Sequence, residues 1–451
     1  MRLTWAQPED LLAHELVQSA TEGKDVAGVV ERWTAAGGEV VPAVSGAGPV
    51  PAPPALRALA RELLDELDAL PAAPAPHEPD GWEQIVALLP APPVLATVPD
   101  DELARRVHGA WSGRAAGCLL GKPVEKIPRQ GIRAIAASTG NWPVRGYFTA
   151  VGLDPEVART YPWNRRSRTT SLLENIDGMP EDDDLNFPLV ALRLLERVGP
   201  DLTTDDVAQA WLADLPGGRV FTAERITYRN LLDGDEPDVA ADVRNPFRSW
   251  IGAQIRSDVY GWANPGSPRA AAGPAWQDGR LSHRRTGLYG ATFVAAACSA
   301  ALVADTVDDV VAAGLSVVPA ESRYAEAVRF GADVARSTGD DETGLDVLHE
   351  RYGHLHWVHA LNNTALLAFA LVRSGGDLDR AVPLAVTGGW DTDSVGATAG
   401  SICGALAGAS SLDPRWTAPL HGRLASSLPG FDGVLFDDLA DRTLALQGAT
   451  R

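Results

Sequence analysis

Apolar residues recur at helical spacing along most of the chain. From about residue 105 onward they fall three or four positions apart, which is the period of a helix with one buried face. Alternation of apolar and polar residues, typical of a half-buried strand, is rare, and no β-α-β order recurs. The pattern therefore predicts an all-α fold. Its clearest helical stretches are 189–198, 205–212, 325–337 and 366–372.

The first 105 residues have a different pattern. Two amphipathic stretches, at about 8–35 and 55–70, flank a linker rich in proline, glycine and alanine at 41–54. Two further proline-rich breaks follow before residue 94. We therefore predict that residues 1–105 form a small helical N-terminal appendage with proline-rich joints.

The remaining chain, residues 106–451, is predicted to form the main domain. Two of its segments, 126–180 and 213–286, are rich in Pro, Gly, Arg, Trp and Asp and show no clear period. Unstructured segments of this length are uncommon in compact domains, and those that occur are usually functional or disordered. We expect an all-α core that carries long inserted loops.

Two stretches carry a glycine at every fourth position. Such a row lies on one stripe of a helix, where a neighbouring helix can approach to backbone distance. Each glycine costs a helix about 1 kcal/mol relative to alanine, so tight packing must compensate. We expect the second of these helices to be central to the fold. The two rows are Gly113, Gly117 and Gly121, and Gly396, Gly400, Gly404 and Gly408.

Composition and charge exclude several classes of partner. The chain has 451 residues with ordinary globular usage, 45% apolar and 22% charged. With 39 basic and 59 acidic side chains, its formal net charge is −20. Such a balance repels phosphate backbones and anionic lipids, so non-specific nucleic-acid binding and membrane-surface binding are disfavoured. It does not disfavour a metal ion, because hard cations bind carboxylates.

Three further features bear on where the protein is found. The uncharged run 287–304 is rich in alanine and serine and lacks a basic flank, so it predicts a buried helix rather than a membrane span. Acidic residues precede any apolar run at the start, so no signal peptide is indicated. Cys118, Cys298 and Cys403 lie among small apolar residues and are expected to be buried thiols. We expect a cytoplasmic protein, with its oligomeric state left open.

Two acidic stretches come just before predicted helices. The run Asp182, Asp183 and Asp184 precedes an apolar helix, and the turn 391–394 opens the second glycine row. Acidic residues at a helix start accept hydrogen bonds from free N–H groups and are favoured by the helix dipole. Taken singly, each stretch is therefore explained by helix capping. In the turn, however, two aspartates two positions apart can also direct both carboxylates at one cation.

A third acidic position, Glu125, follows the first glycine row. The three stretches contain carboxylates and hydroxyls but no His/Cys pair at zinc spacing. Ligand sets made only of oxygen select Mg²⁺, Mn²⁺ or Ca²⁺, and no EF-hand pattern is present. Six carboxylates would suit two cations, which can polarise a substrate hydroxyl and activate a water.

Together these segments resemble the ADP-ribosylglycohydrolase family, which includes dinitrogen-reductase-activating glycohydrolases and ADP-ribosyl-acceptor hydrolases. The resemblance covers about residues 105–425 in the family's order and leaves out the N-terminal appendage. It rests on the segments 113–125, 182–184 and 388–400, with further support from 250–256, 282–291 and 357–363.

The resemblance implies an all-α orthogonal bundle with two divalent cations, Mg²⁺ or Mn²⁺. It implies hydrolysis at the ribose anomeric carbon of an ADP-ribosyl group or a related ribosyl conjugate. The expected partner is accordingly an ADP-ribosylated protein or a small ribosyl conjugate. Two alternatives stay open: a metal-dependent phosphohydrolase with a similar carboxylate cluster, and a non-catalytic ADP-ribose-binding protein of the same fold.

The resemblance also implies the site residues. Aspartate stands at position 182 where the family has threonine, which adds a negative charge beside the cations, and a one-residue shift that places Glu181 there stays open. The expected catalytic residues are Glu125, Asp183 and Asp391. The expected metal ligands are Asp182, Asp183, Asp184, Asp391, Asp393 and Ser394.

The expected substrate-binding residues are Gly252, His283, Gly287, Tyr289 and Asn363. Glycine backbones and helix N-termini can donate N–H groups to a pyrophosphate without adding positive charge. Apart from the resemblance, His283 is equally well explained as a core histidine and Asn363 as a helix cap.

Overall fold

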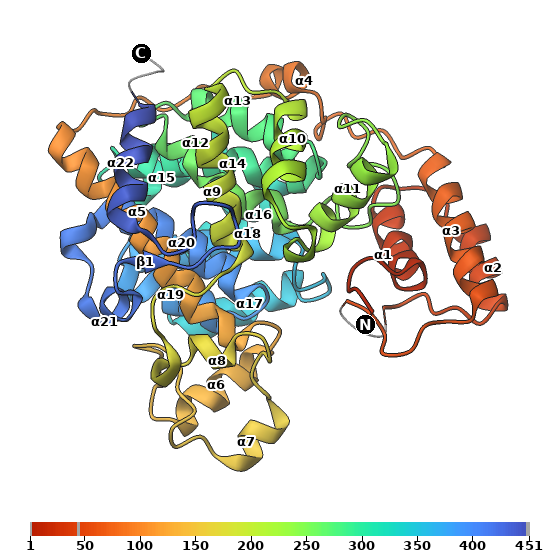
Figure 1. Ribbon diagram of the computed structural model, residues 1–451, viewed down its shortest axis with the longest axis horizontal. Helices are drawn as coiled ribbons and strands as arrows, with labels where there is room; N and C mark the ends of the chain where they lie inside the picture. Colours follow the sequence, from red (N-terminus) through yellow and green to blue (C-terminus); the bar gives the residue numbers. More distant parts are fainter. Residues whose placement is uncertain (1, 43–45, 448–451) are drawn as a thin grey trace.

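The computed structural model describes residues 2–42 and 46–447, and it confirms the predicted all-α fold (Figure 1). The only strands in this described part are β1 (Arg423–Leu424) and β2 (Val434–Leu435). They form one antiparallel pair in which Arg423 lies opposite Leu435. Everything that positions the candidate site is therefore helix or loop.

The helices fall into an N-terminal group and a main bundle. The N-terminal group is α1 (Pro8–Thr21), α2 (Ala27–Ala35), α3 (Pro54–Ala69) and α4 (Trp82–Ala87). The α-helices of the main bundle are α5 (Asp100–Gly121), α6 (Arg129–Ser138), α7 (Pro155–Thr160), α8 (Arg168–Ser171), α9 (Asp183–Val198), α10 (Thr204–Asp214), α11 (Thr222–Asp233), α12 (Asp258–Trp262), α13 (Pro268–Gly279), α14 (Arg285–Ala301), α15 (Val307–Leu315), α16 (Arg323–Ser337), α17 (Asp341–Tyr352), α18 (Ala360–Ser374), α19 (Leu378–Thr387), α20 (Thr392–Ala407), α21 (Pro414–Thr417) and α22 (Phe436–Leu446). The 3₁₀ turns are η1 (Lys122–Val124), η2 (Leu173–Asn175), η3 (Gly217–Arg219), η4 (Ile251–Arg256), η5 (Ala409–Ser411) and η6 (Ala418–Leu420).

The four stretches with the clearest helical period all lie inside helices, namely α9, α10, α16 and α18. The predicted long loops were partly wrong, because both segments contain helices. Segment 126–180 includes α6, α7 and α8, and segment 213–286 includes α11, α12 and α13. Proline begins α7 and α13 at positions where a missing N–H costs nothing. Helix α11 buries Ala223, Ile226 and Asn230 at helical spacing, a face that its polar composition obscures.

The two glycine rows face each other across α5 and α20, which run antiparallel at the centre of the bundle. A Cβ built on Gly109 would lie 2.2 Å from the carbonyl oxygen of Gly404, and one built on Gly117 would lie 1.9 Å from that of Gly396. Only glycine permits this approach. Because the helices are antiparallel, the end of α5 meets the start of α20, and this brings the segments of Glu125 and Asp391 together.

Helix α14 confirms the buried helix predicted for the uncharged run. Its side chains from Thr286 to Ala301 are buried among neighbouring helices. In the described residues, no helix is both long enough and apolar enough to cross a membrane. Cys118, Cys298 and Cys403 are buried free thiols, as predicted.

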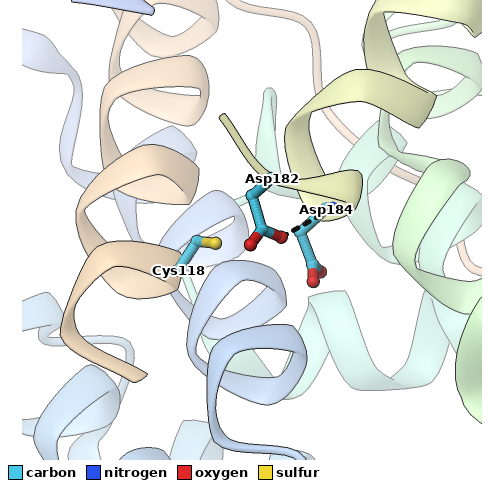
Figure 2. A group of neighbouring side chains, drawn as sticks. All are labelled: Cys118, Asp182 and Asp184. Carbon is cyan, nitrogen blue, oxygen red and sulfur yellow. Dashed lines mark hydrogen bonds between the residues drawn. The ribbon is translucent and has the colours of Figure 1, made fainter. Parts of the chain in front are cut away.

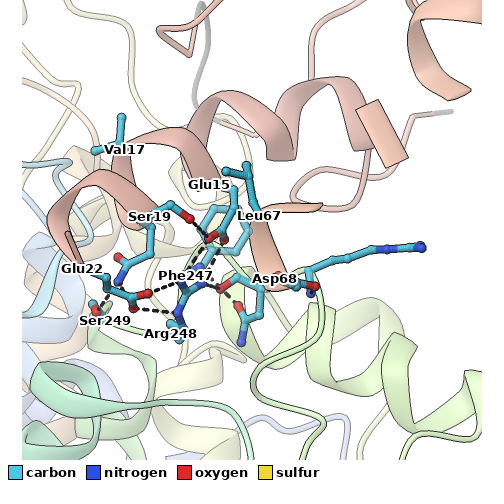
Figure 3. Close-up of polar contacts among 12 residues, drawn as sticks. Glu15, Val17, Ser19, Glu22, Leu67, Asp68, Phe247, Arg248 and Ser249 are labelled. Carbon is cyan, nitrogen blue, oxygen red and sulfur yellow. Dashed lines mark hydrogen bonds and ion pairs between the residues drawn. The ribbon is translucent and has the colours of Figure 1, made fainter. Parts of the chain in front are cut away.

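The N-terminal group packs against the main bundle through a buried cluster of charges (Figure 3). The Arg248 guanidinium donates to Glu15 Oε2 of α1 at 2.9 Å and to Oε2 of Glu22, the residue after α1, at 2.6 Å. The side chains of all three residues are at most 8% exposed. Beside them, Gln18 donates to the Ser249 hydroxyl at 2.9 Å. The chain therefore anchors its N-terminal group on the segment that leads into η4.

Candidate active site

Carboxylates from three distant segments meet at one cavity of about 450 Å³. They come from the turn after α5, the start of α9 and the start of α20. Together with the Cys118 thiol of α5, they form two groups, within each of which one ligand atom per residue lies within 4.8 Å of the others. One group is Cys118, Asp182 and Asp184 (Figure 2). The other is Glu125, Asp391 and Asp393.

The N-terminus of α9 is capped by Asp182, the residue just before the helix. Asp182 caps the helix, because its Oδ1 accepts a hydrogen bond from the Asp184 N–H at 2.9 Å. Asp184 in turn accepts a hydrogen bond at Oδ2 from the Ser394 hydroxyl at 3.2 Å. The capping interpretation thus describes Asp182, while Asp184 and Ser394 join α9 to α20 across the site.

The start of α20 leaves its first carboxylate available to the cavity. Asp391 is the N-cap residue, yet its side chain makes no capping hydrogen bond. Its N–H donates to Asn363 Oδ1 at 3.2 Å, and Thr392 donates from Oγ1 to the Gly121 carbonyl at 2.9 Å. Gly389 and Trp390 adopt positive φ angles of 81° and 65° in the preceding turn. The backbone here is therefore fixed from both α18 and α5, while the Asp391 carboxyl group lines the cavity beside Asp393.

Burial and neighbouring negative charges raise the pKa values of four of these aspartates. Burial, followed by the charges of Asp182 and Asp393, raises the pKa of both Asp183 and Asp184 well above the ordinary range. Burial and the charge of Asp393 do the same for Asp391. Burial, followed by the charge of Glu125, raises the pKa of Asp393 to about 7. This is the electrostatic situation that a bound cation relieves.

Two buried cationic side chains, Lys122 and Arg114, contact these aspartates. Neither was predicted from the sequence. Lys122 lies on η1 and forms an ion pair with Asp182. Arg114, fully buried on α5, donates from Nε to the Asp184 carbonyl at 2.8 Å and pairs with Asp258 at 3.0 Å. Both lie in the first glycine-row segment, beside small residues that leave room for a long side chain. A long cationic side chain among small residues was therefore the sequence feature that could have indicated a buried charge.

The structure places only some of the expected substrate residues at the cavity. Gly252 lines it, and a Cβ at this position would lie 2.1 Å from Glu224 Oε1, so the close approach requires glycine. Asn363 lies behind Asp391, where its side chain also donates to the Trp357 and His359 carbonyls. It therefore positions the turn and does not line the cavity.

The positions of His283, Gly287 and Tyr289 do not support direct contact with a substrate, because none of them lines this cavity. His283 is fully buried beside Ser282, and burial lowers its pKa well below the ordinary value. Gly287 packs against the Arg248 and Trp250 carbonyls. The Tyr289 hydroxyl donates to the Pro79 carbonyl at 2.6 Å, so the N-terminal segment covers it.

The mouth of the cavity carries basic and aromatic side chains that were not expected. Arg165 and Arg166 come from the segment before α8, and the Arg166 guanidinium lies 5.4 Å from the Phe221 ring centre. Arg219 joins them and pairs with Glu181 at 3.0 Å. Trp5 of the N-terminal segment also lines the cavity. Segment 126–180 was expected to be either functional or disordered, and its sequence does not indicate which arginines face the acidic cluster.

Comparison with known proteins adds one assignment. The model of the ADP-ribosylglycohydrolase family matches residues 99–450 of the chain. A solved structure titled ADP-ribosylglycohydrolase-related protein complex is similar at 19% identity, covering 78% of this chain and 100% of its own, with a TM-score of 0.41. No curated protein matches the chain.

Proposed function

We propose that this chain, which belongs to the ADP-ribosylglycohydrolase family, hydrolyses the bond at the ribose anomeric carbon of an ADP-ribosyl group or a related ribosyl conjugate. Membership supports a glycohydrolase; the substrate class and the residues that act on it are our proposal. The observation that carries it is the meeting of Glu125, Asp184, Asp391 and Asp393 at one cavity from three segments up to 268 residues apart in sequence.

The donor set fits divalent cations that prefer oxygen, so we propose Mg²⁺ or Mn²⁺ as the cofactor. The proposed ligands are drawn from Glu125, the acidic run 182–184, Asp391, Asp393 and Ser394. When bound, such a cation polarises a ribose hydroxyl and brings the pKa of a water near neutrality. The raised pKa values of the aspartates support the assignment, since a cluster without cations holds its negative charge only at a cost in free energy.

The chain's own groups supply the remaining chemistry. Positive charge that develops at the anomeric carbon is stabilised by the carboxylates that face the cavity. We propose Glu125, Asp183 and Asp391 as the residues nearest this chemistry. Glu125 accepts a hydrogen bond from Asn164 at 2.5 Å, which fixes its carboxylate at the cavity edge. One of the two aspartates takes the proton from the attacking water.

We further propose that the substrate's phosphate groups lie toward Arg165, Arg166 and Arg219. These guanidinium groups line the cavity that contains the acidic cluster, so they would orient an anionic substrate with its ribose toward the carboxylates. The Gly252 backbone lines the cavity as a further contact. Trp5, Phe221 and Trp357 supply apolar surface against which a base can pack.

The test is turnover of a panel of ADP-ribosylated and ribosylated compounds with Mg²⁺ or Mn²⁺, with products identified by mass spectrometry. We expect free ADP-ribose or ribose, and a loss of at least 100-fold in kcat for Asp391→Asn and Asp393→Asn. Asp305→Asn, which changes a side chain that is 90% exposed, is the matched control and keeps full activity. Release of inorganic phosphate, or no cleavage at the anomeric carbon with either cation, would overturn the proposal.

A further inference from the structure

Lys122 places a protein-borne positive charge inside the acidic site. It is the first residue of η1, three positions before Glu125, and its side chain is only 7% exposed. Its Nζ donates to Asp182 Oδ2 and to the Glu181 carbonyl at 3.1 Å. The ammonium is therefore held by a carboxylate and by a backbone oxygen at the very start of α9.

Asp182 has both of its carboxylate oxygens engaged by the protein. Oδ1 accepts from the Asp184 N–H at 2.9 Å, and Oδ2 pairs with Lys122. Asp184 is similarly engaged, with Arg114 at 3.5 Å from Oδ1 and Ser394 at 3.2 Å from Oδ2. Each of the two aspartates in the first group is thus paired with a buried cationic side chain of the protein itself, Asp182 with Lys122 and Asp184 with Arg114.

The second group, Glu125, Asp391 and Asp393, differs in this respect. In the described residues, no ion pair joins Asp391 or Asp393 to a lysine or arginine. The partner of Glu125 is Lys126 at 3.2 Å, and that lysine is 47% exposed, so water screens its charge. Three carboxylates with ligand atoms within 4.8 Å of one another, none of them ion-paired to a buried lysine or arginine in the described residues, therefore remain for a cation.

We propose that the Lys122 ammonium takes the place of one of the two expected cations, so that the chain binds a single divalent ion between Glu125, Asp391 and Asp393. The proposal also explains why position 182 has aspartate where the family has threonine. An aspartate there supplies the partner that the buried Lys122 ammonium requires. The inference rests on the proposed function only in taking the carboxylate cluster to be a metal site.

The test is the number of Mn²⁺ ions bound per full-length chain, measured by titration calorimetry and by electron paramagnetic resonance without substrate. We expect one ion and the spectrum of an isolated Mn²⁺. Lys122→Met frees Asp182, and we expect it to bind a second ion and to show a spin-coupled pair. Lys126→Met changes the exposed neighbouring lysine and keeps one ion.

Two ions in the parent protein, or none, would overturn the inference, even if Lys122→Met failed to fold. Should Lys122→Met fold and still bind one ion, Lys122 would not be the reason for the single site, and the inference would also fail. The outcome is separate from the proposed function. If the protein binds one ion but cleaves no ribosyl bond, only the proposed function is refuted. If the protein is active but binds two ions, only this inference is refuted.

Discussion

Gly113 of α5 and Gly400 of α20 touch backbone to backbone: a Cβ on Gly113 would lie 2.2 Å from the Gly400 carbonyl oxygen. The atom in the way is backbone, so no side chain can rotate to make room. We predict that Gly113→Ala lowers the free energy of unfolding by about 3 kcal/mol, at the upper end for overpacked cores. Chemical denaturation followed by circular dichroism measures this.

Gly28 offers the matched control for this substitution. It lies on α2, and a Cβ built there would have no atom within 4 Å. Gly28→Ala is expected to be neutral or to stabilise by up to about 1 kcal/mol, the propensity difference between the two residues. Equal effects at both positions would contradict the close packing of α5 against α20.

Arg248 is predicted to be essential for attachment of the N-terminal group. Arg248→Met would leave Glu15 and Glu22 buried without their counter-ion, and breaking a buried pair in this way costs about 3–5 kcal/mol. Thermal unfolding should show the loss, and limited proteolysis should cleave first between residues 22 and 99.

A compensating variant separates charge from packing at the same place. Arg248→Met combined with Glu15→Gln and Glu22→Gln removes the uncompensated charges, so it should recover at least half of the lost free energy of unfolding. If the triple variant were as unstable as Arg248→Met alone, the buried charges would not be the cause.

His14 predicts an acid-side loss of stability. It packs among aromatic rings, and burial lowers its pKa from 6.5 to about 4. Between pH 6.5 and about 4, His14 is protonated in the unfolded chain but stays neutral in the folded protein. Its contribution to stability is therefore complete above pH 6.5 and is lost as the pH falls toward 4, by about 3 kcal/mol at most. His14→Phe removes the titration, so its unfolding free energy should converge on that of the parent, or pass it, in acid. Parallel curves from pH 7 to 4 would refute this.

Asn363 is predicted to tune metal binding without touching the metal. Its Oδ1 accepts from the Asp391 N–H at 3.2 Å, so Asn363→Leu loosens the turn that presents Asp391. Partners of this kind are worth about 10–100-fold in metal affinity, and calorimetry with Mn²⁺ should show a loss in that range. Asn362→Leu changes the adjacent buried amide, which bonds to the His356 carbonyl instead, and should leave the affinity within threefold.

The sequence predicted the helical class and the carboxylates because both depend on local pattern. Helical spacing is visible at α9, α16 and α18, and acidic residues stand out at Asp391 and Asp393. The two glycine rows were recognised as packing stripes, but nothing within either row says that the other is its partner. Such pairing is a tertiary property, set by how the whole bundle closes.

The buried cations could not be predicted for a similar reason. Lys122 follows a glycine and precedes a proline, a context that suggests an exposed turn, and its partner Asp182 lies 60 residues away. Arg165 and Arg166 were recognisable as basic residues, but only the path of the chain from η1 to α9 turns them toward the cavity. His283 and Tyr289 were expected to meet substrate, and the N-terminal segment that covers Tyr289 lies more than 200 residues earlier.

The contacts of residues 71–80 have a practical consequence for anyone who produces this protein. A recombinant fragment that begins at residue 99, where the family model begins, would lose the acceptor of the Tyr289 hydroxyl and the Asp80 carboxylate that accepts from the Arg285 N–H at 2.6 Å. It would also expose the Arg248 guanidinium and one wall of the cavity. The smallest fragment worth purifying therefore extends well beyond the part of the sequence shared with the family.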